Sequence, residues 1–410
     1  MSATPQGPVK EHARLRPSGS DTAGPPTRPR RFHELDLLRL VAALAVVAFH
    51  YTFRASVSHP VLAETGFHDP HGIFRYGYLG VDLFFVISGF VILNSSWNKP
   101  ASSFVASRVA RLYPAFWVAC TITALVIVLD PNERFGVSIG QWLVNLTMAP
   151  DLFGVNQVDG VYWTLLVELK FYALILVLCL IRMTRTRVLA FAIGWLAVSI
   201  WHSLVPLPSL LTQLLIPDWS AFFIAGILFA LIAREGWQPR YAGPLAIAYV
   251  WCLHLAAQFA DGQSESYGGN LRTGTVLAIV TSIFVVFGLI SSHKLHARWT
   301  AKVAFLGALT YPVYLLHQNI GFVLFGLGNG HVGKWPLAAL VLGTVLSLSW
   351  ALHVLVERQV GPPLSRWVRG RLTSIRDALA GVRPMDELRH SDLPLASTPA
   401  AKQFAETSTR

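Results

Sequence analysis

Charged residues are scarce in this chain. Asp, Glu, Lys and Arg together supply 13% of its 410 residues, whereas hydrophobic residues supply 53% and the mean hydropathy is +0.49. A soluble domain of this length needs more polar residues to cover its surface. The composition therefore excludes an ordinary soluble globular protein and favours a protein embedded in lipid.

Cysteine is also scarce, with three residues in the whole chain. Cys120, Cys179 and Cys252 each fall within an apolar run, and their spacing matches neither a disulfide framework nor a zinc site. We interpret them as small core residues, and the sequence predicts no metal site.

Long hydrophobic runs, in contrast, are abundant. A helix of about 20 apolar residues crosses the hydrocarbon layer of a bilayer, and the chain is predicted to be an all-α polytopic membrane protein with about ten transmembrane helices. Residues 139–149 are apolar but too few to cross, so we expect them to lie at the interface or to re-enter the membrane. The predicted spans are 35–54, 76–96, 104–129, 160–181, 187–205, 210–233, 240–260, 273–291, 302–327 and 335–357.

Lys and Arg are concentrated in alternate connections between these spans. The N-terminal segment, the even-numbered connections and the C-terminal tail are rich in them, whereas the odd-numbered connections carry few. Because basic residues stay on the cytoplasmic side, this alternation predicts a multi-pass protein of the cell membrane with both termini in the cytoplasm. The net charge of +11 then reflects topology and attraction to anionic membrane lipids, and not nucleic-acid binding.

The two ends of the chain differ from its middle. Residues 1–32 are rich in Pro, Ser, Thr, Gly and Arg and have no apolar core region, which predicts a disordered basic cytoplasmic arm and not a signal peptide. Residues 33–360 form the predicted membrane domain. For residues 361–410 we expect a cytoplasmic tail, with a short helix on the membrane surface over 364–379 and disorder after it.

Several ionisable residues fall inside the predicted spans, where each is costly and is a functional candidate by default. Arg39 and His50 share one face of the first span and stand about 16 Å apart along its axis. The alternatives are structural: Arg39 can snorkel and pair with Asp36, and His50 can bond a backbone carbonyl. The residues expected to share the outer half of the membrane, as a site or as a structural polar network, are His50, Asp82, Glu168 and His317.

Two tyrosines accompany these residues at helical spacing. Tyr172 follows Glu168 by one turn, and Tyr314 precedes His317 by one turn, so we expect each tyrosine to share a face with its partner. Lys170 points away from this face.

A basic pair lies at the cytoplasmic end of the third predicted span. Arg108 and Arg111 are one turn apart and face nearly the same way. Arginine forks suit phosphate oxygens, so a phosphate-bearing cytoplasmic ligand is one natural partner. Lipid headgroups are the other.

At these residues the sequence resembles the membrane-bound acyltransferase family 3. Five motifs occur in the order typical of that family and cover about 33–360; each alone is modest, but five in order are highly specific. The motifs are Arg39-x10-His50, Gly77-Tyr-Leu-Gly-Val-Asp-Leu-Phe-Phe-Val-Ile-Ser-Gly-Phe90, Arg108-x-x-Arg111 followed by Tyr-Pro, Trp163-Thr-Leu-x-x-Glu168-x-x-Phe-Tyr172 and Thr310-Tyr-Pro-Val-Tyr-Leu-Leu-His317.

The resemblance implies a ten-helix core that takes an acyl group, commonly acetyl, from an acyl-coenzyme A at the cytoplasmic side. The acceptor is a hydroxyl of a sugar-containing or natural-product molecule. Two departures are visible: Lys170 stands where uncharged or acidic residues are common, and the extracytoplasmic hydrolase-like domain of some members is absent, which makes a small acceptor more plausible. The roles implied are His50 as catalytic residue, Arg39, Arg108 and Arg111 for the donor, and Glu168, His317, Trp163, Tyr172 and Tyr314 in support.

The residue types suit this chemistry. An imidazole with a pKa near neutrality can take the proton of a hydroxyl as it attacks a thioester, and we expect His50 to do so. A carboxylate, Glu168 or Asp82, is expected to hold the imidazole tautomer. An acyl-histidine intermediate stays an alternative, because no Ser or Cys is obviously placed as nucleophile.

Two other classes of protein compete with the enzyme. A proton-coupled transporter also needs His and carboxylate groups at depth, but it favours inverted repeats, which are not evident here, and it does not call for arginines gathered at one membrane face. A noncatalytic scaffold leaves the buried charges unexplained.

Overall fold

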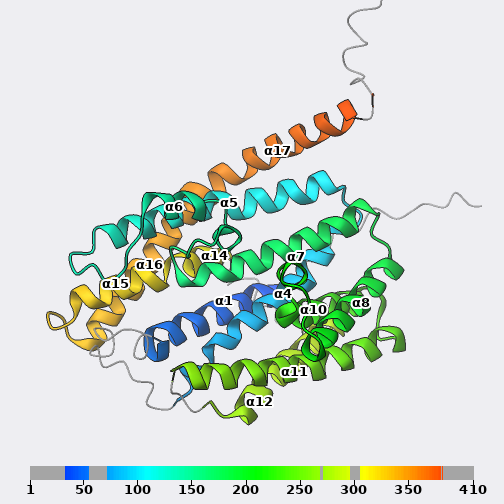
Figure 1. Cartoon of the computed structure of the whole chain (residues 1–410), viewed down its shortest axis with the longest axis horizontal. Helices are drawn as coiled ribbons and strands as arrows, with labels where there is room; N and C mark the ends of the chain where they lie inside the picture. The colour runs from blue at the N-terminus through cyan, green and yellow to red at the C-terminus, as the bar shows by residue number, and fades with distance from the viewer. Residues whose placement is uncertain (1–32, 55–71, 268–270, 296–304, 380, 382–410) are drawn as a thin grey trace, which may run out of the picture. The chain divides into compact units, whose positions relative to one another are not determined.

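The structure, a computed structural model, describes residues 33–54, 72–267, 271–295, 305–379 and 381. Its described residues form helices and no strands, and those from His33 onward belong to one unit (Figure 1). The predicted arm 1–32 and the predicted disorder over 382–410 lie outside the described residues.

Helices make up most of the described residues. In chain order they are α1 (His33–Ala48), the π-helical turn η1 (Phe49–Arg54), η2 (Phe74–Leu79), α4 (Gly80–Ser96), α5 (Ala101–Val128), α6 (Ile139–Asn145), η3 (Pro150–Phe153), η4 (Gly160–Tyr162), α7 (Trp163–Leu180), α8 (Arg185–Leu204), α9 (Ser209–Leu215), α10 (Pro217–Glu235), α11 (Pro239–Tyr267), α12 (Thr273–Ser291), α14 (Leu306–Leu316), α15 (Gln318–Gly328), α16 (Lys334–Leu352), the π-helical turn η5 (His353–Glu357) and α17 (Arg358–Leu379).

Nine helical segments in the described part of the chain are long and apolar enough to cross a membrane. They correspond to nine of the ten predicted spans, which confirms the all-α polytopic membrane fold. The predicted span 302–327 differs, because its described residues form two shorter apolar helices, α14 and α15. The predicted span is therefore not one regular helix, and the break falls at His317.

Side chains take the place of the backbone hydrogen bonds that this break removes. The amide of Asn319 donates to Oδ2 of Asp159 at 3.0 Å, and the carbonyl of Leu315 accepts from the hydroxyl of Tyr162 at 3.2 Å. At membrane depth no water is available for such groups, so a broken helix is tolerated only where the protein satisfies them. His317 therefore lies at a helix break that residues of a separate segment of the chain stabilise by hydrogen bonds.

That segment is the connection between α5 and α7. Helix α6 begins with a capping box between Ser138 and Gln141, and the chain then turns back. The side chain of Asn145 fixes the turn: its amide donates to the carbonyl of Asn156 at 3.0 Å and its oxygen accepts from the amide of Val158 at 2.9 Å. The apolar segment 139–149 thus begins as the short helix α6, and the segment after it carries Asp159 to the break in α14–α15.

A second irregularity lies at the end of α1, where the helix widens into the π-turn η1. The hydroxyl of Thr52 donates to the carbonyl of Ala48 at 2.7 Å, and Nδ1 of His50 lies 2.9 Å from the carbonyl oxygen of Val46. Single π-turns of this kind are frequent at functional sites. His50 is the second residue of this turn.

Helix α10 forms the centre of one half of the bundle. It packs against α4, α8, α11 and α12, and all residues over 220–232 are buried (Figure 1). It meets α4 where two glycines cross. A Cβ atom on Gly89 would overlap the carbonyl oxygen of Phe223, and one on Gly226 would overlap that of Val86. Small residues permit membrane helices to approach this closely.

The C-terminal helix α17 is longer than predicted. It follows directly on α16 through η5 and begins at Arg358, not near 364. It runs beside α5 in Figure 1, and its Gly361 faces the carbonyl oxygen of Ala110. The start of this helix is therefore part of the bundle, while its Trp367 and Ile375 are exposed.

Candidate active site

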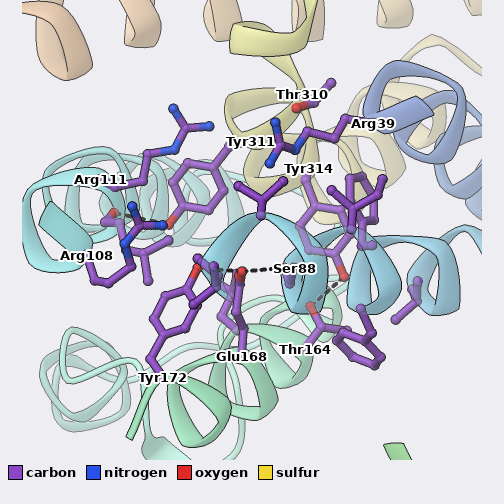
Figure 2. A pocket seen from close by; sticks show the side chains of 18 residues that line it. Arg39, Ser88, Arg108, Arg111, Thr164, Glu168, Tyr172, Thr310, Tyr311 and Tyr314 are labelled. Atoms are coloured by element: carbon purple, nitrogen blue, oxygen red, sulfur yellow. Dashed lines mark hydrogen bonds between the residues drawn. The ribbon is translucent and has the colours of Figure 1, made fainter. Parts of the chain in front are cut away.

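A cavity opens among α1, α4, α5, α7 and α14. Its empty volume is about 840 Å³ including the open mouth, and Figure 2 shows the side chains that line it. Apolar residues of α4, among them Phe84 and Val91, form one wall. Six of the ten predicted site residues also line it: Arg39, Arg108, Arg111, Glu168, Tyr172 and Tyr314.

Three arginines from two helices give this cavity a positive wall. Figure 2 shows the guanidinium groups of Arg39, Arg108 and Arg111 with Tyr311 between them. Arg39 keeps the expected contact with Asp36, with Nη1 and Oδ1 at 3.2 Å, and lines the cavity as well. Because the described lining holds three arginines and one carboxylate, an anionic ligand is electrostatically favoured.

Glu168 is the carboxylate in this lining, and its oxygen Oε1 has two partners. The hydroxyl of Ser88 donates to it at 2.8 Å and the hydroxyl of Tyr172 at 2.5 Å. The expected shared face of Glu168 and Tyr172 is confirmed. The guanidinium of Arg108 lies 5.7 Å from the centre of the Tyr172 ring, so the tyrosine links the acid to the arginine pair.

The two predicted histidines meet at the helix break. Nε2 of His317 lies 3.2 Å from Nδ1 of His50, and the ring centres are 5.0 Å apart. Both rings are buried, and the hydroxyl of Tyr51 donates to the carbonyl of His317 at 2.7 Å. A turn of α1 and the α14–α15 junction are thereby joined.

The partners of this pair assign its hydrogens. Nδ1 of His317 lies 2.9 Å from the carbonyl oxygen of Tyr314 and 3.2 Å from that of Val313, so it must donate. In the neutral ring, Nε2 of His317 then accepts, so Nδ1 of His50 must carry a hydrogen, which it shares between this nitrogen at 3.2 Å and the carbonyl of Val46 at 2.9 Å. Nε2 of His50 is left with a lone pair, which is the tautomer that a general base needs.

The partner of His50 differs from the expected one. A carboxylate, Glu168 or Asp82, was expected to hold this ring; in the described residues its hydrogen-bonding groups are His317 and the carbonyl of Val46. Glu168 lies in the arginine-lined cavity, and Asp82 lines a different cavity among α4, α10 and α11.

Tyr314 connects the cavity to the histidine pair. Its side chain lines the cavity, and its ring centre is 5.7 Å from that of His317. The hydroxyl of Tyr314 lies 2.7 Å from that of Thr164 and donates to the carbonyl of Val161 at 3.2 Å, which fixes the ring (Figure 2). The histidines themselves are absent from the described lining and lie behind this tyrosine.

Trp163 takes a position away from the arginine-lined cavity. It begins α7, and its ring centre is 5.0 Å from that of Trp219. Trp163 therefore does not support the site by contact with the arginines. It contacts Trp219, which lines the same cavity as Asp82.

Sequence reasoning did not single out Asp159. Its carboxylate accepts from the amides of Asn319 and Val161, at 3.0 and 3.2 Å, and burial raises its pKa to about 7 although these bonds and Arg54 act in the opposite direction. The residue stands before the predicted fourth span, where an acid reads as an ordinary helix cap. Nothing in the local pattern indicates that it reaches a distant helix break.

Comparison of the sequence with known proteins identifies the family of this chain. The model of a family described as "Acyltransferase domain" matches residues 32–354. The chain belongs to acyltransferase family 3. This membership makes it a membrane acyltransferase and removes the support for a transporter or a scaffold.

Curated members of the family resemble most of the chain. Nodulation protein 10 of Rhizobium leguminosarum bv. viciae is 27% identical over 78% of this chain and 91% of its own length. Acyltransferase MdmB of Streptomyces mycarofaciens is 25% identical over 81% and 92%. Exopolysaccharide production protein ExoZ of Rhizobium meliloti (strain 1021) is 26% identical over 78% and 96%. No solved structure matches the chain.

Proposed function

We propose that this acyltransferase takes its acyl group, expected to be acetyl, from an acyl-coenzyme A. The acceptor is a hydroxyl of a sugar-containing or natural-product molecule. The observation that carries the proposal is the continuity of the site: a cavity with three arginines ends at Tyr314, directly beside the His50–His317 pair.

The donor's phosphates would bind Arg108 and Arg111, with Arg39 opposite. Arginine forks bind phosphate oxygens in pairs of hydrogen bonds, and Glu168 and Tyr172 hold Arg108 in place through the Tyr172 ring. The pantetheine arm would follow the apolar wall of α4. The helical rise separates Arg39 from His50 by about 16 Å, a distance that this arm can bridge.

The transfer step then uses the tautomer assigned to the histidine pair. Nε2 of His50 takes the proton of the acceptor hydroxyl as the hydroxyl oxygen attacks the thioester carbonyl carbon. The tetrahedral intermediate collapses, the carbon–sulfur bond breaks, and the imidazolium returns the proton to the coenzyme A thiolate. His317 and the carbonyl of Val46 share the Nδ1 hydrogen of His50 throughout and stabilise the imidazolium, as a carboxylate does in other enzymes.

An acyl-histidine route uses the same residues. In that route Nε2 of His50 attacks the thioester carbonyl carbon and the coenzyme A thiolate leaves. The acceptor hydroxyl then attacks the acyl-imidazole, the carbon–nitrogen bond to His50 breaks, and the hydroxyl proton balances the charge of the thiolate. Trapping labelled acyl group on the protein in the absence of acceptor would favour this second route.

The acceptor class is supported by the names of relatives. One relative is an exopolysaccharide production protein, which is in keeping with a sugar-containing acceptor. We place the protein in the cell membrane with both termini in the cytoplasm, as the alternation of basic residues predicts.

A direct assay tests the donor and the acceptor together. Purified protein is incubated with labelled acetyl-coenzyme A and a panel of glycosides, and products are read by mass. We expect label on an acceptor hydroxyl and release of free coenzyme A, with His50→Ala as the blank. Failure of the protein both to bind and to cleave acetyl-coenzyme A would remove this donor.

The membrane orientation needs its own test. A reporter fused after Arg410 should be active only if it works in the cytoplasm, and one inserted near Gly262 only if it works outside. Reporters that placed the connections 130–160 and 182–187 on the same side would contradict donor entry from the cytoplasm.

A further inference from the structure

A second cavity lies among α4, α10 and α11, and the proposed transfer does not use it. Its empty volume is about 540 Å³ including the opening, and α10 packs against both α4 and α11 (Figure 1). Two carboxylates, from Asp82 and Asp218, line this cavity together with Trp219, Phe222, Gln258 and Phe259. No Lys, Arg or His is among its described lining residues.

Asp82 is the unusual member of this lining. It is 5% exposed, and within the described part of the chain its carboxylate has no hydrogen-bond donor and no ion-pair partner. Burying a carboxylate without a partner is strongly unfavourable, so the fold alone does not explain this residue. The amide of Gly80, the first residue of α4, is not a partner either, because it already donates to the carbonyls of Gly77 and Tyr78.

Aromatic rings form a large part of the wall. The ring centres of Trp219 and Phe259 are 5.2 Å apart at 68°, and Phe259 lies 5.5 Å from Tyr78. Aromatic faces attract organic cations, and ammonium groups are recognised by such rings. A metal cation is less suited to this lining, because calcium and magnesium require six or more oxygen ligands.

The cavity is close to the histidine pair. The ring of Tyr78 is 5.8 Å from that of Phe49, which is 5.2 Å from the ring of His50. The hydroxyl of Tyr78 is buried and has no described partner. A molecule held at Asp82 therefore lies within a few side chains of His50, and Phe85 of α4 stands between it and the arginine-lined cavity.

We propose that this cavity binds the protonated amino group of the acceptor, so that the acceptor is a hydroxyl-bearing amine such as an amino sugar. Asp82 receives the ammonium hydrogens, Trp219 and Phe259 face the cation, and Asp218, which is exposed, attracts it at the opening. The inference rests on the proposed function and adds a substrate class to it.

Equilibrium binding to the purified full-length protein tests the cavity without the transfer reaction. The probes are methyl glucosaminide and methyl glucoside, which differ by an ammonium group in place of a hydroxyl. We expect the amine to bind about tenfold tighter or more, a preference that corresponds to one buried ion pair or cation–π contact. Equal affinity for the two probes would overturn the proposal.

Matched variants locate the preference. Asp82→Asn keeps the shape and removes the charge, and it should abolish the preference for the amine while acetyl-coenzyme A still binds. Trp219→Leu should reduce the preference. If the Asp82 variant does not fold, Asp218→Asn, a change at an exposed position, still tests the attraction of the ammonium group by a carboxylate and should also reduce the preference. A preference that survived both Asp82→Asn and Trp219→Leu would contradict the proposal, as would competition by calcium chloride with no binding of the amine.

The two proposals fail separately. Binding of the amine without cleavage of acetyl-coenzyme A would remove the donor and keep this cavity as an amine site. Cleavage and transfer without any preference for the amine would do the reverse.

Discussion

His317 places its Nε2 atom 3.2 Å from Nδ1 of His50, although 267 positions separate the two residues in the chain. The hydrogen bonds of His317 to backbone carbonyls fix its own tautomer, and His317 together with the carbonyl of Val46 fixes that of His50. A neutral imidazole thus occupies the place that a carboxylate takes in many histidine-based sites. In a membrane this choice avoids one buried charge in the resting state.

Replacing His50 by Ala should remove the general base. We expect transfer to fall by about 2–4 orders of magnitude while the protein still accumulates in the membrane. The measurement is the rate of labelled acetyl transfer per mole of purified protein. Near-normal activity would contradict the mechanism.

Substitutions of His317 test its role as a positioning residue. His317→Gln keeps a side-chain acceptor for the Nδ1 hydrogen of His50, whereas His317→Phe keeps the ring and removes the acceptor. We expect kcat to fall by about tenfold to a hundredfold in the Phe variant and less in the Gln variant, with KM for the donor nearly unchanged. Equal losses in the two variants, or a loss confined to KM, would assign His317 a structural role only.

The arginine pair should determine donor affinity. Arg108→Lys with Arg111→Lys keeps the charge and removes the two-pronged geometry, so we expect acetyl-coenzyme A to bind about tenfold more weakly with little change for the acceptor. Arg240→Lys is a matched control, because Arg240 pairs with Glu235 away from the cavity. Unchanged donor affinity in the double variant would assign the pair to lipid headgroups.

Close packing of α4 on α10 should be sensitive to a single methyl group. Gly226→Ala places a Cβ atom against the backbone of α4, and we expect a loss of about 1–3 kcal/mol in stability. Thermal unfolding in detergent measures it. Gly194→Ala, in α8 with no atom within 4 Å of its added Cβ, should be neutral or slightly stabilising. Similar behaviour of the two variants would contradict the proposed contact.

An ion pair after α5 should make stability depend on pH. Oδ1 of Asp130 lies 2.6 Å from Nη1 of Arg134, and both side chains are buried. Burial acts to raise the pKa of Asp130, but the amides of Asn132 and Arg134 and the Arg134 guanidinium together hold it below its usual value.

Because this pKa is lower in the folded state, the stabilisation is complete above the unfolded value of about 3.9 and is lost as the pH falls through and below it. We expect the wild-type protein to be more stable than Asp130→Asn at neutral pH. The difference between their unfolding temperatures should shrink below about pH 5. A difference that did not change with pH would show that the charge of Asp130 contributes nothing.

The predictable part of the site follows from spacing along single helices. Arg108 and Arg111, or Glu168 and Tyr172, share a face because they are one turn apart, and the structure has each pair on one cavity wall. Depth in the membrane is a weaker guide. Asp82 was grouped with Glu168 by depth. However, the residue of α4 that bonds Glu168 is Ser88, six positions after Asp82, so Asp82 is turned by about 120° around the helix axis and faces the other cavity.

The break at His317 could not be predicted from its own segment. The run 306–328 is apolar apart from a few residues, chiefly the triplet His317, Gln318 and Asn319, which does not by itself end a helix, and Pro312 lies inside α14 without ending it. What ends the helix is the pairing of Asn319 with Asp159, a residue 160 positions earlier. Such a contact leaves no periodic signal in either segment.

The break in α14–α15 has a consequence for the order in which the protein assembles. Before Asp159 and Tyr162 are in place, the amide of Asn319 and the carbonyl of Leu315 have no partner in lipid except each other, so the segment must enter the bilayer as an unbroken helix. Only when the connection before α7 has docked can the amide of Asn319 and the carbonyl of Leu315 bond Asp159 and Tyr162 in place of each other, so that the helix breaks at His317. The histidine pair is therefore completed late in folding, and a chain whose 130–162 connection is incorrectly placed would insert normally and remain inactive.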